Sequence, residues 1–141
     1  MSCNKTNSAK ITPELAAGSV ASPYFVQVNI SQRLCNPVCV DETPVFAPVF
    51  SIKGYAEVGT GQYVVTIHVE GIISYNPCGS CGCCSKQQNI SQDFTVPFAS
   101  TAAPTSVTIA AGTSVNAISA TACQKCSRDF VSETPITLTV A

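Results

Sequence analysis

The strongest constraint on the fold is the alternation of apolar and polar residues with a period of two. It is clearest over residues 62–70, where the apolar positions are Tyr63, Val65, Ile67 and Val69. Successive side chains of a strand point to opposite faces, so this pattern predicts a strand with one buried face. Similar segments rich in Val, Ile, Thr, Phe or Tyr predict further strands at residues 24–30, 46–57, 90–98, 106–110, 114–121 and 135–140.

Turn signals separate these segments. Residues 59–61 predict a short hairpin between two strongly patterned strands, and residues 111–113 join two weaker ones. Pro48 and Pro97 lie inside or beside strand patterns, which favours edge strands or bulges. No window of a dozen residues has a helical apolar stripe. We therefore predict an all-β, single-domain β-sandwich of residues 23–141, jelly-roll-like, with an extended N-terminal arm of residues 1–22.

Low charge restricts the classes of partner. The 141 residues include 7 Lys and Arg against 8 Asp and Glu, and only 11% of the chain is charged. The basic residues are scattered, whereas nucleic acids and anionic membranes are bound by clustered ones. No run of 18 apolar residues is present, so membrane insertion is not expected. With 16 Ser and 14 Thr, the surface is expected to be hydroxyl-rich and mostly uncharged.

The first residues, 1–8, are polar and lack the apolar region and cleavage site of a secretory signal. Either the chain is a mature form, or the protein leaves its cell without the general secretory route. An extracellular or surface location without a recognisable secretory signal is therefore expected. Catalysis is not expected. His68 is the only histidine and lies on the polar face of a predicted strand, and no nucleotide, haem or paired-carboxylate motif is present.

The nine cysteines fall into groups, which are Cys3 alone, Cys35 and Cys39, then Cys78, Cys81, Cys83 and Cys84, and finally Cys123 and Cys126. All except Cys3 are predicted to lie in loops beside the β core. The total is odd, and Cys3 stands on the arm, ahead of the first strand. An odd thiol in such a position is suited to an intersubunit disulfide.

Two hypotheses account for the eight loop cysteines. Four disulfides at the rim of the sandwich would each contribute about 2 to 4 kcal/mol by restricting the unfolded chain. The alternative is a structural zinc ion held by two CxxC pairs, Cys78, Cys81, Cys123 and Cys126, because a two-residue spacer lets both thiolates face one tetrahedral metal. The zinc hypothesis leaves Cys83 and Cys84 without a role. Otherwise no cofactor is expected.

These features are typical of a self-associating structural subunit, whose low charge removes repulsion between copies. An arm or terminal strand would pair with a sheet edge of the next copy. Cys3 on the arm, residues 89–93 before a strand and the terminal strand 136–140 resemble the fibre subunits of bacterial endospore appendages. The resemblance implies a jelly-roll subunit of a filament, in which Cys3 bonds covalently to a neighbouring copy. The CxxCxCC loop and the 123–126 pair depart from that plan.

Two other functions remain open on the sequence alone. The same scaffold would serve as a phage or capsid decoration protein, or another binding module, with a partner surface in place of self-assembly. A zinc-stabilised β domain that binds a cellular partner is the third interpretation. The sequence predicts the first function, a homopolymer stabilised by disulfides.

Overall fold

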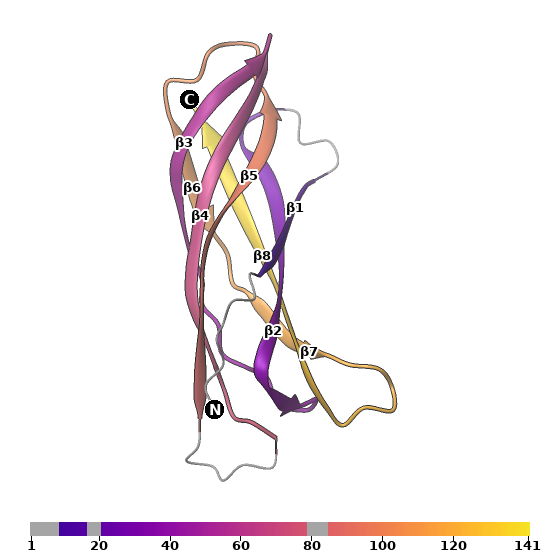
Figure 1. Ribbon diagram of the computed structural model, residues 1–141. Coiled ribbons are helices and arrows are strands. Elements are labelled where there is room, and N and C mark those ends of the chain that lie inside the picture. The colour runs from indigo at the N-terminus through magenta and orange to yellow at the C-terminus, as the bar shows by residue number, and fades with distance from the viewer. Residues whose placement is uncertain (1–8, 17–20, 79–84) are drawn as a thin grey trace.

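The chain forms two antiparallel sheets that pack face to face in a β-sandwich, which confirms the predicted all-β class (Figure 1). The computed structural model describes residues 9–16, 21–78 and 85–141. Within these residues it contains strands and no helix. The strands are β1 Lys10–Leu15, β2 Tyr24–Cys39, β3 Val49–Gly59, β4 Gln62–Tyr75, β5 Lys86–Ala99, β6 Val107–Ala111, β7 Val115–Ser119 and β8 Cys126–Val140.

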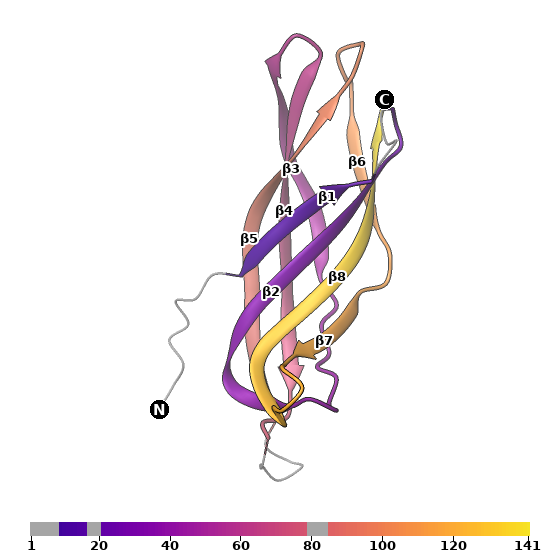
Figure 2. The ribbon, with the colours of Figure 1, turned by 90° about the vertical axis from the view of Figure 1, so that its right-hand side faces the viewer.

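The two sheets differ in their connectivity. β3, β4 and β5 form a three-stranded sheet in chain order. In the other sheet β1 pairs with β2 and β2 with β8, and both β6 and β7 pair with the far edge of β8. Figure 2 shows β1, β2 and β8 running side by side across this second sheet. The long strands β2 and β8 therefore form its centre.

The inward faces of both sheets make one hydrophobic core, because the alternating pattern places every second side chain between them. The largest fully buried side chains include Ile30, Leu34, Ile67, Ile73, Phe130, Ile136 and Leu138. Aromatic rings meet edge to face within the core, with Phe46 against Phe130 and Phe50 against Phe94, at centroid distances of 5.6 and 6.1 Å. The predicted hairpin at residues 59–61 is confirmed, and Gly61 takes the positive φ of 73° that such a turn requires.

β2 and β8 extend well beyond the predicted segments 24–30 and 135–140. The extensions place polar side chains inward, and these break the apolar alternation that a sequence pattern detects. Gln32, Ser127, Ser132 and Thr134 are at most 5% exposed. Each is satisfied by a hydrogen bond, for example from Ser132 Oγ to Asn116 Oδ1 at 2.8 Å. Buried polar groups with partners are tolerated in a strand, so the ladder continues through them.

β6 and β7 do not pair with each other, although residues 111–113 separate them as a turn would. They follow one another along the same edge of β8, β6 opposite residues 136–140 and β7 opposite residues 129–133. The break falls at Pro135, whose carbonyl accepts a hydrogen bond from Gly112 N at 2.8 Å. In an antiparallel strand a residue's N–H and C=O point to the same side, and proline has no N–H to donate there. The ladder is therefore interrupted at this residue.

The segment expected as an arm contains an edge strand, since β1 pairs with β2 over its whole length. Just before β1, Ala9 is held against β5 of the other sheet. The Gln92 side chain accepts a hydrogen bond from Ala9 N at 3.0 Å and donates one to Ala9 O at 2.8 Å. These two bonds fix the point at which the chain enters the sandwich. Residues 1–8, including Cys3, lie outside the described residues.

Gly71 is required by packing, which gives a test of the core. A Cβ at this position would lie 2.6 Å from Phe46 Cε1 and 3.2 Å from the Pro48 backbone. We expect Gly71→Ala to lower the free energy of unfolding by about 1–3 kcal/mol, as overpacking does. Gly54→Ala is the matched control, because a Cβ there meets nothing within 4 Å. Chemical denaturation of both variants measures the difference, and equal stabilities would contradict the packing.

Candidate functional site

Three cysteines far apart in the sequence meet at one end of the sandwich. Cys39 and Cys126 are Cα partners in the β2–β8 ladder, and their sulfurs are 3.8 Å apart. Cys78, three residues after β4, places its sulfur in bonding contact with both. We call Cys39, Cys78 and Cys126 the cysteine triad. Since β4 belongs to the three-stranded sheet, a disulfide from Cys78 to either of the others links the two sheets covalently.

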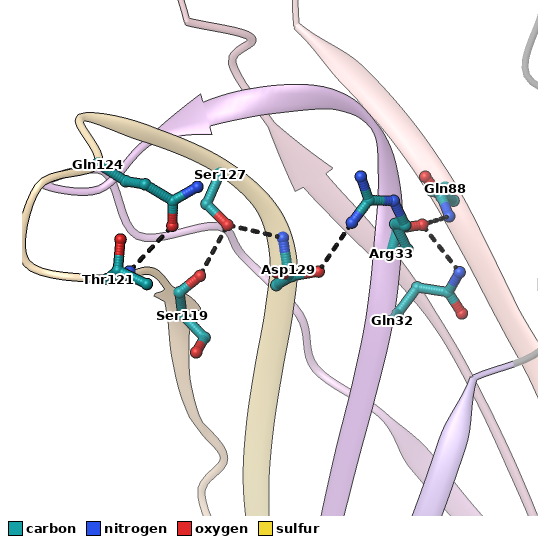
Figure 3. A network of polar contacts seen from close by, with 8 residues as sticks. All are labelled: Gln32, Arg33, Gln88, Ser119, Thr121, Gln124, Ser127 and Asp129. Carbon is teal, nitrogen blue, oxygen red and sulfur yellow. Dashed lines mark hydrogen bonds and ion pairs between the residues drawn. The ribbon is translucent and has the colours of Figure 1, made fainter.

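The backbone around the triad is held in place by a bulge and the contacts that support it. β2 loses its register against β8 between Arg33 and Val38. The Arg33 carbonyl accepts hydrogen bonds from Gln32 Nε2 at 3.0 Å and from Gln88 Nε2 at 3.1 Å, as Figure 3 shows. Gln88 also accepts a hydrogen bond from Cys35 N at 3.2 Å. Because Gln88 lies on β5, these bonds tie the bulge to the other sheet.

The beginning of β8 is held in the same region. Ser127 Oγ donates a hydrogen bond to the Ser119 carbonyl at 2.7 Å and accepts one from Asp129 N at 3.1 Å. The side chain of Asp129 pairs with Arg33 Nη1 at 3.3 Å (Figure 3). Both charged groups of that pair are more than half exposed, so it contributes little to stability. The buried hydroxyl of Ser127 is therefore the stronger constraint on where Cys126 lies.

The prediction that these cysteines lie in loops is wrong for three of them. Cys35 and Cys39 are within β2, and Cys126 is the first residue of β8. The bulge allows this, because it lets β2 continue past Pro37 without a matched register. Cys35 is also disulfide-bonded. Cys123 is a free, exposed thiol, and Cys3, Cys81, Cys83 and Cys84 lie outside the described residues.

The four proposed zinc ligands are only partly brought together. Cys78 and Cys126 are in the triad, and Cys39 was not in that set. Cys123 is outside the triad, and Cys81 is outside the described residues. Zinc is bound by thiolates, so a sulfur engaged in a disulfide is not a ligand. The triad could supply three sulfur ligands to a soft metal ion only after reduction.

A second polar cluster lies on the outer face of the three-stranded sheet and surrounds His68. Its Nδ1 lies 2.7 Å from Asp93 Oδ1 and its Nε2 lies 2.8 Å from Glu70 Oε1. Ser91 Oγ is 3.3 Å from Nε2. The pKa of His68 is raised, first by the hydrogen bond to Asp93 and then by the one to Glu70. Since both nitrogens face carboxylates, the imidazolium is favoured, and it has no lone pair to accept a proton from Ser91.

The outer face of the five-stranded sheet carries a shallow groove between β1 and β7. One hollow of about 530 Å³ is lined by residues of β1, β2, β7 and β8, including Val115, Ala117 and Val131. A second of about 420 Å³ shares Lys10, Ser31 and Val131 with it. The two hollows therefore adjoin. No sequence pattern indicates this groove, because it depends on the pairing of β7 with β8.

Comparisons with known proteins return no relative. No family model matches the chain, and neither a curated protein nor a solved structure is similar enough to count as a match. Among the described residues there is no helix with the length and hydropathy of a membrane span.

The His68 cluster predicts a pH dependence. Because the folded-state pKa is raised above 6.5, the imidazolium stabilises the fold fully below pH 6.5, and this contribution is lost as the pH rises through the folded-state pKa. His68 is the only histidine, so its ring protons can be followed by NMR. We expect a midpoint above 6.5 that falls in Asp93→Asn, with Asp129→Asn as control. A wild-type midpoint at or below 6.5 would contradict the cluster.

Proposed function

We propose that the protein is a structural subunit that assembles with copies of itself into an extracellular or surface filament, through its N-terminal segment and strand-edge pairing, with disulfides stabilising the joints. The observation that carries the proposal is the edge formed by β6 and β7. In the described residues, no strand pairs with the outer side of either one. An unpaired strand edge presents a row of N–H and C=O groups to another chain.

This edge lacks the protection that monomeric proteins usually give it. Charged side chains and prolines keep strand edges from pairing with other molecules. Residues 94–124 contain no charged residue, and neither β6 nor β7 contains a proline. Val115, at the start of β7, is 67% exposed. The combination favours pairing with an apolar, uncharged strand of a second copy.

The groove beside β7 supports a second copy as the partner. Its lining combines apolar side chains with polar ones, which include hydroxyl and amide groups and one charge of each sign, Lys10 and Glu133. The chain itself is low in charge and rich in Ser and Thr. An extended segment of another copy would find both kinds of contact there. The covalent link between the sheets at the triad also suits a subunit under load, because it keeps the two sheets together when one is pulled.

A binding module is the second candidate, and the groove is the observation that favours it. A decoration protein would use the same surface for a different partner. The mass of the purified protein distinguishes the two functions. A binding module stays a small particle in the absence of its partner, whereas a filament subunit assembles with its own copies. The zinc-stabilised domain would require thiolates where the described triad has bonded sulfurs.

A lysine at the exposed edge should block assembly. In Val115→Lys each joint would bury an unpaired ammonium group, which costs more than about 1.4 kcal/mol and raises the concentration needed for assembly about tenfold or more. Val45→Lys is the control, because Val45 has the same 67% exposure and lies outside β6 and β7. Sedimentation velocity measures assembled mass. If Val115→Lys assembles as the parent does, the edge is not the joint.

The proposed intersubunit disulfide of Cys3 is tested separately. We expect Cys3→Ser to leave the fold intact, because the residue precedes all the described strands, and to make assemblies dissociate more readily in hot detergent. The free, exposed Cys123 provides a control in Cys123→Ser. Dissociation is read on non-reducing gels across a temperature series. If assemblies of Cys3→Ser and of the parent resist hot detergent equally, Cys3 does not link the copies.

A further inference from the structure

The triad contains an odd number of sulfurs, and this has a chemical consequence. Cys78 lies within disulfide reach of both Cys39 and Cys126, but a sulfur forms one disulfide at a time. When Cys78 is bonded to Cys39 or to Cys126, the sulfur of the remaining cysteine is a thiol next to that disulfide. All three reacting atoms lie within 4.8 Å of one another. A thiol this close to a disulfide is positioned for exchange.

Both pairings are compatible with the same backbone. The Cα–Cα distance is 5.0 Å between Cys39 and Cys78 and 6.5 Å between Cys78 and Cys126. Both values fall in the range of about 4.4–6.8 Å that disulfides span. Cys78 N also donates a hydrogen bond to the Pro37 carbonyl at 2.8 Å, which holds it beside the end of β2. Both partners are therefore within the Cα–Cα reach of a disulfide to Cys78.

We propose that the triad is a thiol–disulfide exchange site, in which Cys78 is bonded in turn to Cys39 and to Cys126, and the sulfur left out forms a mixed disulfide with an external molecule that carries a disulfide. In the internal step the Cys126 thiolate attacks Cys78 of the Cys39–Cys78 disulfide. The Cys78–Cys126 bond forms, the Cys39–Cys78 bond breaks, and Cys39 leaves as a thiolate that takes up a proton. No sulfur is oxidised overall.

The external step consumes a disulfide supplied by the other molecule. The thiolate left out of the internal bond attacks one sulfur of that disulfide, a mixed disulfide forms, and the other half leaves as a thiolate. Oxidation of the protein sulfur is balanced by reduction of the departing one. The three residues of the triad are partly buried rather than sealed in the core.

Exchange preserves the link between the sheets. Cys39 and Cys126 occupy the same rung of the β2–β8 ladder, so either bond ties Cys78 to the same place. When either Cys39 or Cys126 forms a mixed disulfide with an external molecule, the other one can still bond to Cys78. The third cysteine therefore makes this link redundant, and it gives the chain a defined site for covalent modification. This holds whether or not the chain assembles.

The test is a disulfide map of the unreduced protein, alkylated at once and digested. We expect Cys78 to be found with Cys39 in some molecules and with Cys126 in others, with the remaining sulfur alkylated. Cys78 with a single partner in all molecules, or with neither, would overturn the proposal. Incubation with glutathione disulfide should then place one glutathionyl group on Cys39 or Cys126, and none on either would also overturn it.

Variants distinguish modification of the triad from modification of the free thiol of Cys123. Cys39→Ser and Cys126→Ser each leave two sulfurs that pair, so glutathionylation at the triad should be lost while that of Cys123 continues. Cys123→Ser should show the reverse, with modification retained at the triad. Thermal denaturation checks that each variant is folded. Sedimentation reports assembly independently, so failure of the exchange and failure of the proposed function are distinguishable.

Discussion

The burial of one face from each sheet is the interaction on which the rest of the structure depends. The alternating pattern places Ile30, Ile67, Phe130 and their neighbours between the sheets, and that packing holds β2 and β8 opposite β4. Cys78 is brought to the Cys39–Cys126 rung only because the sheets are stacked in this way. The same stacking leaves β6 and β7 with an unpaired outer edge among the described strands. The cysteine site and the candidate joint are therefore consequences of one core.

Much of the fold could be predicted from the sequence where apolar residues alternate. Residues 62–70 and the turn before them were assigned correctly, because every inward position there is apolar and Gly61 marks the turn. The N-terminal half of β8 was missed, because Ser127, Ser132 and Thr134 occupy inward positions and are satisfied by hydrogen bonds that only the folded chain supplies. A strand signal based on hydropathy cannot identify such residues.

The candidate site was predicted by residue type but not by arrangement. The cysteines stood out by number and spacing, and two of the four proposed zinc ligands do meet. Their third companion, Cys39, lies 39 residues before Cys78, and only the register of β2 with β8 places it opposite Cys126. The His68 cluster has the same origin, since His68 and Asp93 become neighbours through the pairing of β4 with β5. Long-range register carries no local sequence signal.

Low charge and covalent links serve one purpose in the proposed function. An uncharged edge allows copies to approach and pair, and disulfides then make the fold and its joints resistant. Negative-stain electron microscopy of the purified, unreduced wild-type protein tests this most directly. Filaments of regular width are the predicted result. Discrete particles of monomer size at every concentration would contradict the structural role and favour a binding module.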